Sequence, residues 1–278
     1  MKKKSLHGLL IAILCILFIA ITTIYFFNDK SQYKVEDLNF INTKLLISGK
    51  VGEELTFPTI FFINKQINSK NLIDDVFLLD SPNAEIVKWY LTDGSTYKDS
   101  KLNNINITIK LTKVGNNVIN GLKIRFKSGT YKEYKFKGWI TDVLDGSQNN
   151  LIVASKEAYI ASNSNTIFDL KNISGKTLKL AELDLISNKA TIDKGNFTIN
   201  GKIYTSIKDI ELSKNDIIDL SISPKFQEYY DILYIRPYIK YTLDGKEIRE
   251  PITQGSVYGL QIDENKMSKM YNRYINKK

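Results

Sequence analysis

The chain has 278 residues, a formal net charge of +9 and 43% hydrophobic residues. Its single histidine, His7, and its single cysteine, Cys15, both stand close to the N-terminus. The residues from 28 onward therefore offer no disulfide, no ordinary zinc site and no Ser-His-Asp or Cys-His catalysis. Adjacent acids such as Asp74 and Asp75 would point to opposite faces of a strand and make poor acid–base pairs. We expect a protein that is not an enzyme and that uses no metal and no cofactor.

An uncharged run from Leu9 to Phe27 follows three lysines, Lys2–Lys4. At about 1.5 Å per residue the run covers roughly 28 Å, close to the thickness of a bilayer core. The lysines favour a cytoplasmic N-terminus, residues 1–8, with the rest of the chain outside the cell membrane. The run ends without an Ala-x-Ala cleavage site. An uncleaved single-pass anchor at 9–27 is therefore favoured over a cleaved signal or a lipoprotein, and a juxtamembrane linker follows at 28–35.

The positive charge is concentrated at the two ends of the chain. Lys2–Lys4 precede the anchor, and the tail, residues 264–278, holds five basic residues against one acidic residue. The body between them has only a small excess of positive charge, whereas a nucleic-acid surface needs a concentrated basic footprint. We therefore expect no nucleic-acid partner.

The chain after the anchor repeats at an offset of 106 to 107 residues. Thr59-Ile60-Phe61 recurs as Thr166-Ile167-Phe168. The offset gives further pairs: Leu79 with Leu185, Ala84 with Ala190, and Ile86 with Ile192. The repeat predicts two modules and a linker, at residues 36–141, 151–263 and 142–150. The aspartates of the linker lack the spacing of an EF-hand loop, which favours a hydrated linker over a calcium site.

Short β-strands account for most of this region. Residues 105–111 alternate apolar and polar side chains, and Asn200-Gly201 is a two-residue hairpin turn. Many short strands in units of this size predict an all-β exterior of two tandem antiparallel β-sandwiches after one N-terminal transmembrane helix. Residues 168–174, Phe-Asp-Leu-Lys-Asn-Ile-Ser, resemble the F-x-L-x-N-x-S opening of immunoglobulin-like modules on membrane-anchored bacterial extracellular proteins. The resemblance implies immunoglobulin-like folds and a non-catalytic surface role.

The first candidate binding face is a hairpin between residues 123 and 137. Alternation places its basic side chains on one face, opposite Ile124 and Phe126. The members of this face are Lys123, Arg125, Lys127, Lys135 and Lys137. They are candidates to bind an anionic envelope polymer or phospholipid headgroups. The alternative is that the lysines protect an exposed strand edge from pairing with other chains.

The second candidate face is a strand at residues 234–241. Alternation puts an aromatic and cationic row on one side: Tyr234, Arg236, Tyr238 and Lys240. Such a row could bind sugars or a peptide. Because Pro237 cannot donate to a strand ladder, an edge strand or a bulge is expected, and an edge could accept a partner strand. The alternative is that tyrosine is simply a favoured strand residue.

The tail predicts a short amphipathic helix. Its apolar stripe consists of Met267, Met270, Tyr271, Tyr274 and Ile275. A helix of this kind could contact a membrane or a partner. Because an isolated helix of fewer than about 15 residues is marginal, docking on the second module, or fraying, is favoured.

The usage of Lys, Ile and Asn favours a bacterial origin. We interpret the chain as a membrane-anchored protein outside the cytoplasm that binds an envelope protein or a cell-wall polymer. The alternative is a structural or accessory subunit of a multi-protein envelope assembly for transport or secretion, held through its transmembrane helix.

Overall fold

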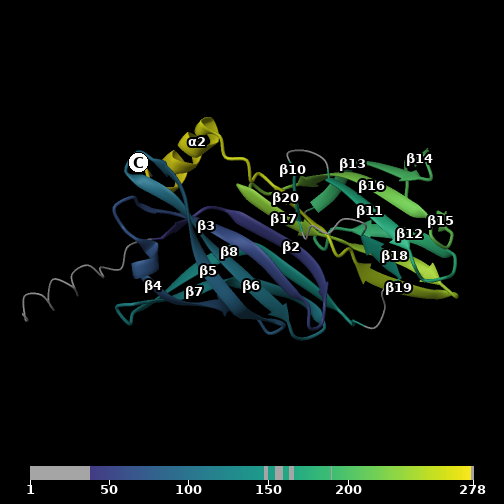
Figure 1. The fold of residues 1–278 in the computed structure, drawn as a ribbon, viewed down its shortest axis with the longest axis horizontal. Coiled ribbons are helices and arrows are strands. Elements are labelled where there is room, and N and C mark those ends of the chain that lie inside the picture. Colours follow the sequence, from purple (N-terminus) through teal and green to yellow (C-terminus); the bar gives the residue numbers. More distant parts are fainter. Residues whose placement is uncertain (1–37, 147–149, 154–158, 163–165, 189, 277–278) are drawn as a thin grey trace, which may run out of the picture.

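The computed structural model describes residues 38–146, 150–153, 159–162, 166–188 and 190–276. The predicted cytoplasmic segment, anchor and juxtamembrane linker lie outside these ranges. Within them the protein is all-β apart from the 3-10 turn η1 (Ser69–Asn71) and the helix α2 (Glu264–Tyr274) (Figure 1). Neither helical segment is an apolar helix of membrane-spanning length.

Four sheets build the fold, with their strands in the following orders. The first sheet is β1 (Asn39–Phe40), β3 (Glu54–Asn64), β6 (Ser100–Leu111) and β5 (Ala84–Tyr97). The second is β10 (Tyr159–Ser162), β20 (Gly255–Tyr258), β17 (Ile232–Arg236), β2 (Thr43–Lys50), β8 (Tyr131–Leu144), β7 (Gly115–Phe126) and β4 (Ile73–Leu79). The third is β14 (Lys202–Tyr204), β13 (Ala190–Ile199), β16 (Ile217–Phe226), β11 (Thr166–Asn172) and β9 (Leu151–Val153). The fourth is β15 (Glu211–Leu212), β12 (Leu178–Asp184), β18 (Tyr238–Leu243) and β19 (Lys246–Pro251).

Two hydrophobic cores lie between these sheets. The first core joins side chains of the first and second sheets, with Phe57, Ile107 and Trp139 among its fully buried members. The second core joins the third and fourth sheets, with Phe168, Leu220 and Tyr241 fully buried. We call residues 38–146 the first half and residues 150–258 the second half.

The strand pairing has the same order in both halves. Strand β6 lies between β3 and β5, as β16 lies between β11 and β13. Likewise, β4, β7 and β8 pair in sequence as β12, β18 and β19 do. Two residues paired by the repeat, Ala84 and Ala190, each begin a strand. Just before them, Asp80 (φ 51°) and Ile186 (φ 69°) are related by the same offset. Both adopt the left-handed backbone conformation, which is uncommon for residues other than glycine.

The F-x-L-x-N-x-S motif has a structural role. Phe168 and Leu170 belong to the second core, and Asn172 is fully buried behind them. The amide nitrogen of Asn172 donates to three carbonyl oxygens at 2.7–3.0 Å: those of Lys176, Leu212 and Ser213. Its Oδ1 accepts from the Ser174 backbone N–H at 3.0 Å. The motif thus satisfies buried carbonyl groups where two connections meet.

The second sheet is shared between the halves, because β17 pairs in parallel with β2. Leu45 and Tyr234 face the first core, whereas Leu46 and Ile235 face the second core. In Figure 1 the strands β2 and β17 lie between the earlier strands on the left and the later strands on the right. The predicted modules 36–141 and 151–263 are therefore joined by one continuous sheet. The boundaries of the two modules stay a prediction.

The expectation of an edge strand at residues 234–241 is wrong. Strand β17 is paired on both sides, and Pro237 stands where the chain leaves β17 for β18 in another sheet. The Pro237 carbonyl accepts hydrogen bonds from Ser48 Oγ at 2.7 Å and from the Ile252 backbone N–H at 3.0 Å. The missing N–H of proline therefore falls at a switch between sheets, a position that loses no ladder bond.

The predicted linker, 142–150, does not begin as a hydrated segment. Asp142 is buried inside β8 and forms an ion pair with Arg249 of β19. Residues 147–149 lie outside the described ranges. Asn150 again contacts the second half, because its backbone N–H donates to the Glu250 carboxylate at 3.1 Å.

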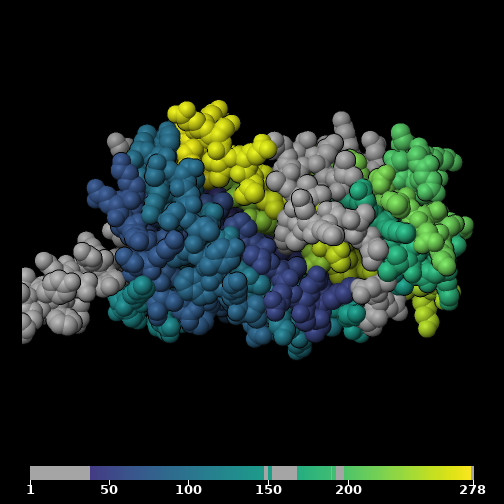
Figure 2. Space-filling model, viewed as in Figure 1, coloured from purple at the N-terminus to yellow at the C-terminus, as the bar shows by residue number. Residues whose placement is uncertain are grey.

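The tail forms the predicted helix but docks on the other core. Met267, Met270 and Tyr271 are buried in the first core, and not against the second module as expected. The Tyr271 hydroxyl donates to Asp99 Oδ1 at 2.7 Å, and Asp263 caps the helix by accepting from the Lys266 backbone N–H. Figure 2 shows α2, in yellow, lying against the blue strands of the first half. The helix α2 therefore closes the first core.

Candidate functional site

A groove of about 860 Å³ lies between the two halves. One wall comes from the first half, at residues 114–116 and 142–144. The other comes from the second half, at residues 182–188 together with Tyr238 and Arg249. The two walls are 38 residues apart in the chain at their nearest, between Leu144 and Glu182. Only the joining of the halves brings them together.

An aromatic and charged cluster lines the groove. The Arg249 guanidinium stacks 4.1 Å from the centre of the Tyr238 ring and forms an ion pair with Asp142. The Tyr238 hydroxyl donates to Asp184 Oδ2 at 2.5 Å. Burial, and then the bond to Asp184, raise the pKa of Tyr238. The cluster therefore ties β8 of the first half to β18 and β19 of the second.

The carboxylates of the groove each have a cation or a hydroxyl as partner. Lys240 Nζ lies 2.7 Å from Glu182 Oε2, a hydrogen bond that raises the pKa of Lys240. Each carboxyl of the cluster is thus held by a partner within the protein. Among the described residues, no group of three His, Cys, Asp or Glu side chains could hold a metal ion. The groove offers a mixed polar and apolar surface that is suited to binding.

The four residues of the predicted row at 234–240 do not share one environment in the structure. Tyr234 and Arg236 are each 1% exposed, so the expectation that they face solvent is wrong. Arg236 donates to Glu53 Oε1 at 2.6 Å and to the Ile252 carbonyl at 2.8 Å. The reason is the shared sheet, because β17 buries both of its faces. Tyr238, although also buried, lines the groove, and Lys240 contacts its wall through Glu182.

The basic hairpin exists as predicted, with β7 paired to β8 and with Ile124 and Phe126 buried. Its positive charge is partly balanced. Arg125 pairs with Asp74 at 2.6 Å, and Lys123 stands opposite Glu133 in the register, 5.0 Å from the Tyr131 ring centre. The remaining members of the face are exposed: Lys127, Lys135 and Lys137. Their role in binding stays a prediction.

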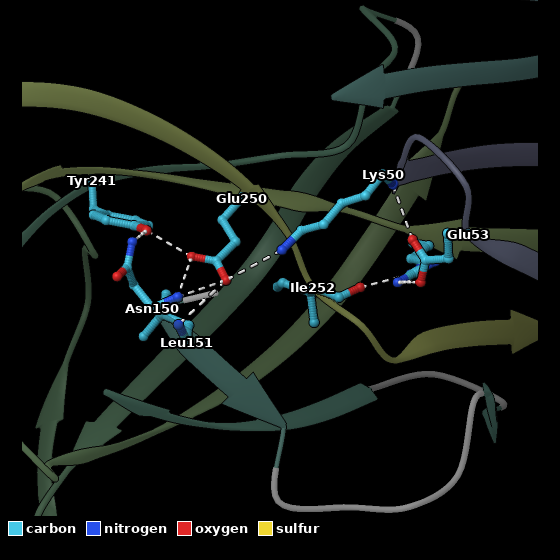
Figure 3. Close-up of polar contacts among 8 residues, drawn as sticks. Lys50, Glu53, Asn150, Leu151, Tyr241, Glu250 and Ile252 are labelled. Carbon is cyan, nitrogen blue, oxygen red and sulfur yellow. Dashed lines mark hydrogen bonds and ion pairs between the residues drawn. The ribbon is translucent and has the colours of Figure 1, made fainter. Parts of the chain in front are cut away.

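A second buried network, which the sequence did not predict, lies at the same junction (Figure 3). The Glu250 carboxylate accepts from the Tyr241 hydroxyl at 2.6 Å and from the Leu151 backbone N–H at 3.3 Å. The Asn150 side chain donates to the Tyr241 oxygen at 2.7 Å, and Lys50 Nζ lies 3.8 Å from Glu250. The only signal in the sequence was a polar residue at an inward-facing position of a strand. Such a residue is equally typical of the end of a strand.

Burial raises the pKa of Glu250, against the opposing effect of its hydrogen bonds. A carboxyl whose pKa is higher in the folded than in the unfolded state contributes its full stability at a pH below the unfolded-state pKa. This contribution is lost as the pH rises through the folded-state pKa. We therefore expect wild-type protein to lose stability relative to Glu250→Gln as the pH rises above 4.5. Urea unfolding over a pH series tests this. Glu247→Gln, an exposed position on the same strand, should leave the profile unchanged; matching profiles for all three proteins would contradict the prediction.

No protein-family model matches the chain, and no curated protein is similar to it in sequence. Solved structures do match. A mutant of the Escherichia coli adhesin CfaE is 11% identical with a TM-score of 0.29, over 79% of this chain and 96% of that one. The fibronectin(III)-like modules of Clostridium thermocellum CbhA are 8% identical with a TM-score of 0.21, over 81% and 94%.

The secreted serine protease VesC of Vibrio cholerae is 13% identical with a TM-score of 0.22, over 84% of this chain and 53% of that one. The matches include bacterial adhesin and fibronectin-like all-β modules, in line with the loose resemblance expected from the sequence, and they identify no specific family.

Proposed function

We propose that this chain is a non-catalytic binding protein of a bacterial envelope. It would be held by the anchor at residues 9–27 and would present two tandem immunoglobulin-like sandwiches outside the membrane. The matching strand order in the two halves supports the tandem arrangement. The uncharged run after Lys2–Lys4 supports the anchor. The partner is an envelope protein or a cell-wall polymer.

The groove between the halves is the observation that carries this proposal. Its walls belong to different halves, yet the shared sheet and the Arg249–Asp142 ion pair hold them in one arrangement. A site that is already formed loses less conformational entropy on binding than two modules on a free linker. The paired carboxylates and the buried Tyr238 favour binding of a partner without catalysis.

Asn116→Trp tests the groove, because Asn116 is an exposed residue of β7 in the groove wall. An indole there fills part of the space, and we expect recovery of the partner to fall at least tenfold without loss of stability. Asn120→Trp is the matched control, since Asn120 is exposed on the same strand but lies outside the groove. Crosslinking in intact cells, followed by mass spectrometry, identifies and counts the partner. Equal recovery with both variants would remove the groove from consideration.

The same crosslinking measurement distinguishes the proposed binding protein from the alternative, a subunit of an envelope assembly. Replacement of residues 9–27 by an unrelated apolar segment should leave groove-dependent recovery intact. Loss of the partner on this replacement, with no effect of Asn116→Trp, would favour an assembly held through the transmembrane helix.

A further inference from the structure

Three connections meet at one end of the first half, and we call them the basic end. They are residues 65–72, 98–99 and 127–130, which follow β3, β5 and β7. The Lys65 backbone N–H donates to the Asp99 carbonyl at 2.9 Å, and Lys65 Nζ donates to the Lys98 carbonyl at 2.9 Å. The Lys127 backbone N–H donates to the Leu72 carbonyl at 2.9 Å. These bonds fix the three connections as one surface.

The two ends of the first half differ in charge. The basic end contains one acidic residue, Asp99, and four exposed lysines: Lys65, Lys70, Lys98 and Lys127. Lys70 also forms an exposed ion pair with Asp93 of β5 at 3.7 Å, which solvent screens. The carboxylate of Asp99 already accepts from the Tyr271 hydroxyl. At the opposite end, the connections 51–53, 80–83 and 112–114 contain two acids and one lysine. Positive charge is therefore concentrated at one end of the sandwich.

The chain enters the first half at this basic end. Asn39 pairs with Phe62, two residues before β3 ends at Asn64, and Ser100 pairs with Asn64. Because β1 is antiparallel to β3, β1 begins beside the end of β3 that leads into residues 65–72. The segment 28–37 separates it from the predicted anchor and reaches at most about 35 Å when extended. An anchored chain therefore holds this end toward the bilayer.

We propose that the basic end rests on the membrane and binds the headgroups of anionic phospholipids through Lys65, Lys70, Lys98 and Lys127. This inference rests on the membrane anchoring in the proposed function. Clustered lysines close to an anionic bilayer are attracted to it over about a Debye length. The groove lies toward the opposite end, beside residues 114–116. Docking of the basic end would therefore hold the groove away from the membrane, facing its partner.

The test uses the full chain with Cys15→Ser and Ser128→Cys, so that a donor dye marks an exposed residue of the basic end. The protein is reconstituted in vesicles of phosphatidylcholine, with or without phosphatidylglycerol, whose headgroups carry an acceptor dye. We expect stronger energy transfer with phosphatidylglycerol, lost at high salt. Replacing the four lysines with glutamine should abolish the lipid dependence, since each contributes about fivefold to the ratio of docked to undocked molecules.

The control variant replaces four exposed lysines of the second half, Lys202, Lys208, Lys214 and Lys246, with glutamine, and should keep the lipid dependence. The salt measurement needs no substitution of lysine. Carbonate extraction separates the two hypotheses: a chain that is extracted overturns the anchored function and this inference with it. A chain that stays in the vesicles but shows equal transfer in both lipids, or equal loss in both variants, overturns the inference alone.

Discussion

Asp231→Ala is expected to lower the free energy of unfolding by about 3–5 kcal/mol and to release α2 from the first core. The Asp231 side chain is 1% exposed. It accepts from the Asn42 backbone N–H at 3.0 Å and from the Tyr274 hydroxyl at 2.5 Å. Arg273 lies 3.0 Å from the carboxylate. Alanine would leave the half-buried Tyr274 hydroxyl and the Arg273 guanidinium without this acceptor, and the Asn42 N–H would keep only its bond to the Tyr274 oxygen at 2.9 Å. The loss would weaken the contact between the helix and the chain just before β2.

Burial raises the pKa of Asp231, so the buried carboxylate is itself costly to the fold. The expected loss therefore comes from the donors that remain and not from the removal of a favourable charge. Urea unfolding measures the loss, and amide hydrogen exchange of α2 reports its release. Asp74→Ala is the control, because the Asp74 side chain, which pairs with Arg125, is 45% exposed. Loss of this exposed ion pair should lower the free energy of unfolding by less than about 1 kcal/mol. Similar losses in the two variants would contradict this account.

Local features were predictable because they depend on neighbours in the chain. The hairpin of residues 123–137, the Asn200-Gly201 turn and the tail helix each follow from a short pattern. The repeat offset also placed Ala84 and Ala190 at equivalent strand starts. In each case the pattern alone determines which side chains face inward.

The shared sheet was not predictable in the same way, because β17 and β2 pair in parallel although their paired residues, such as Thr43 and Ile232, are 189 positions apart in the chain. One signal was present: Leu45-Leu46-Ile47 and residues 232–235, Ile-Leu-Tyr-Ile, are continuous apolar runs. Such runs are typical of parallel strands buried on both faces. The prediction of an exposed row at 234–240 was wrong because it assumed a sheet with one solvent-exposed face. The groove depends on the same long-range pairing, so its walls could not be brought together from the sequence.

Leu46→Ala is expected to lower the free energy of unfolding by about 2–5 kcal/mol. Leu46 is fully buried and belongs to the second core, although its strand begins the first half. The truncation removes buried methyl groups and leaves a cavity among side chains of the second half. If the shared sheet makes the halves one cooperative unit, the whole described chain should still unfold in a single calorimetric transition, at a lower temperature.

Leu45→Ala provides the comparison, because Leu45 has the same residue type, the same strand and the same full burial but faces the first core. Both variants should shift one common transition, and hydrogen exchange should rise in both halves. Independent halves would behave differently: Leu46→Ala would split off a transition of the second half, and Leu45→Ala a transition of the first. A single shared transition would mean that β2 and β17 couple the two cores into one cooperative unit, since neither strand can shift without disturbing side chains on both of its faces.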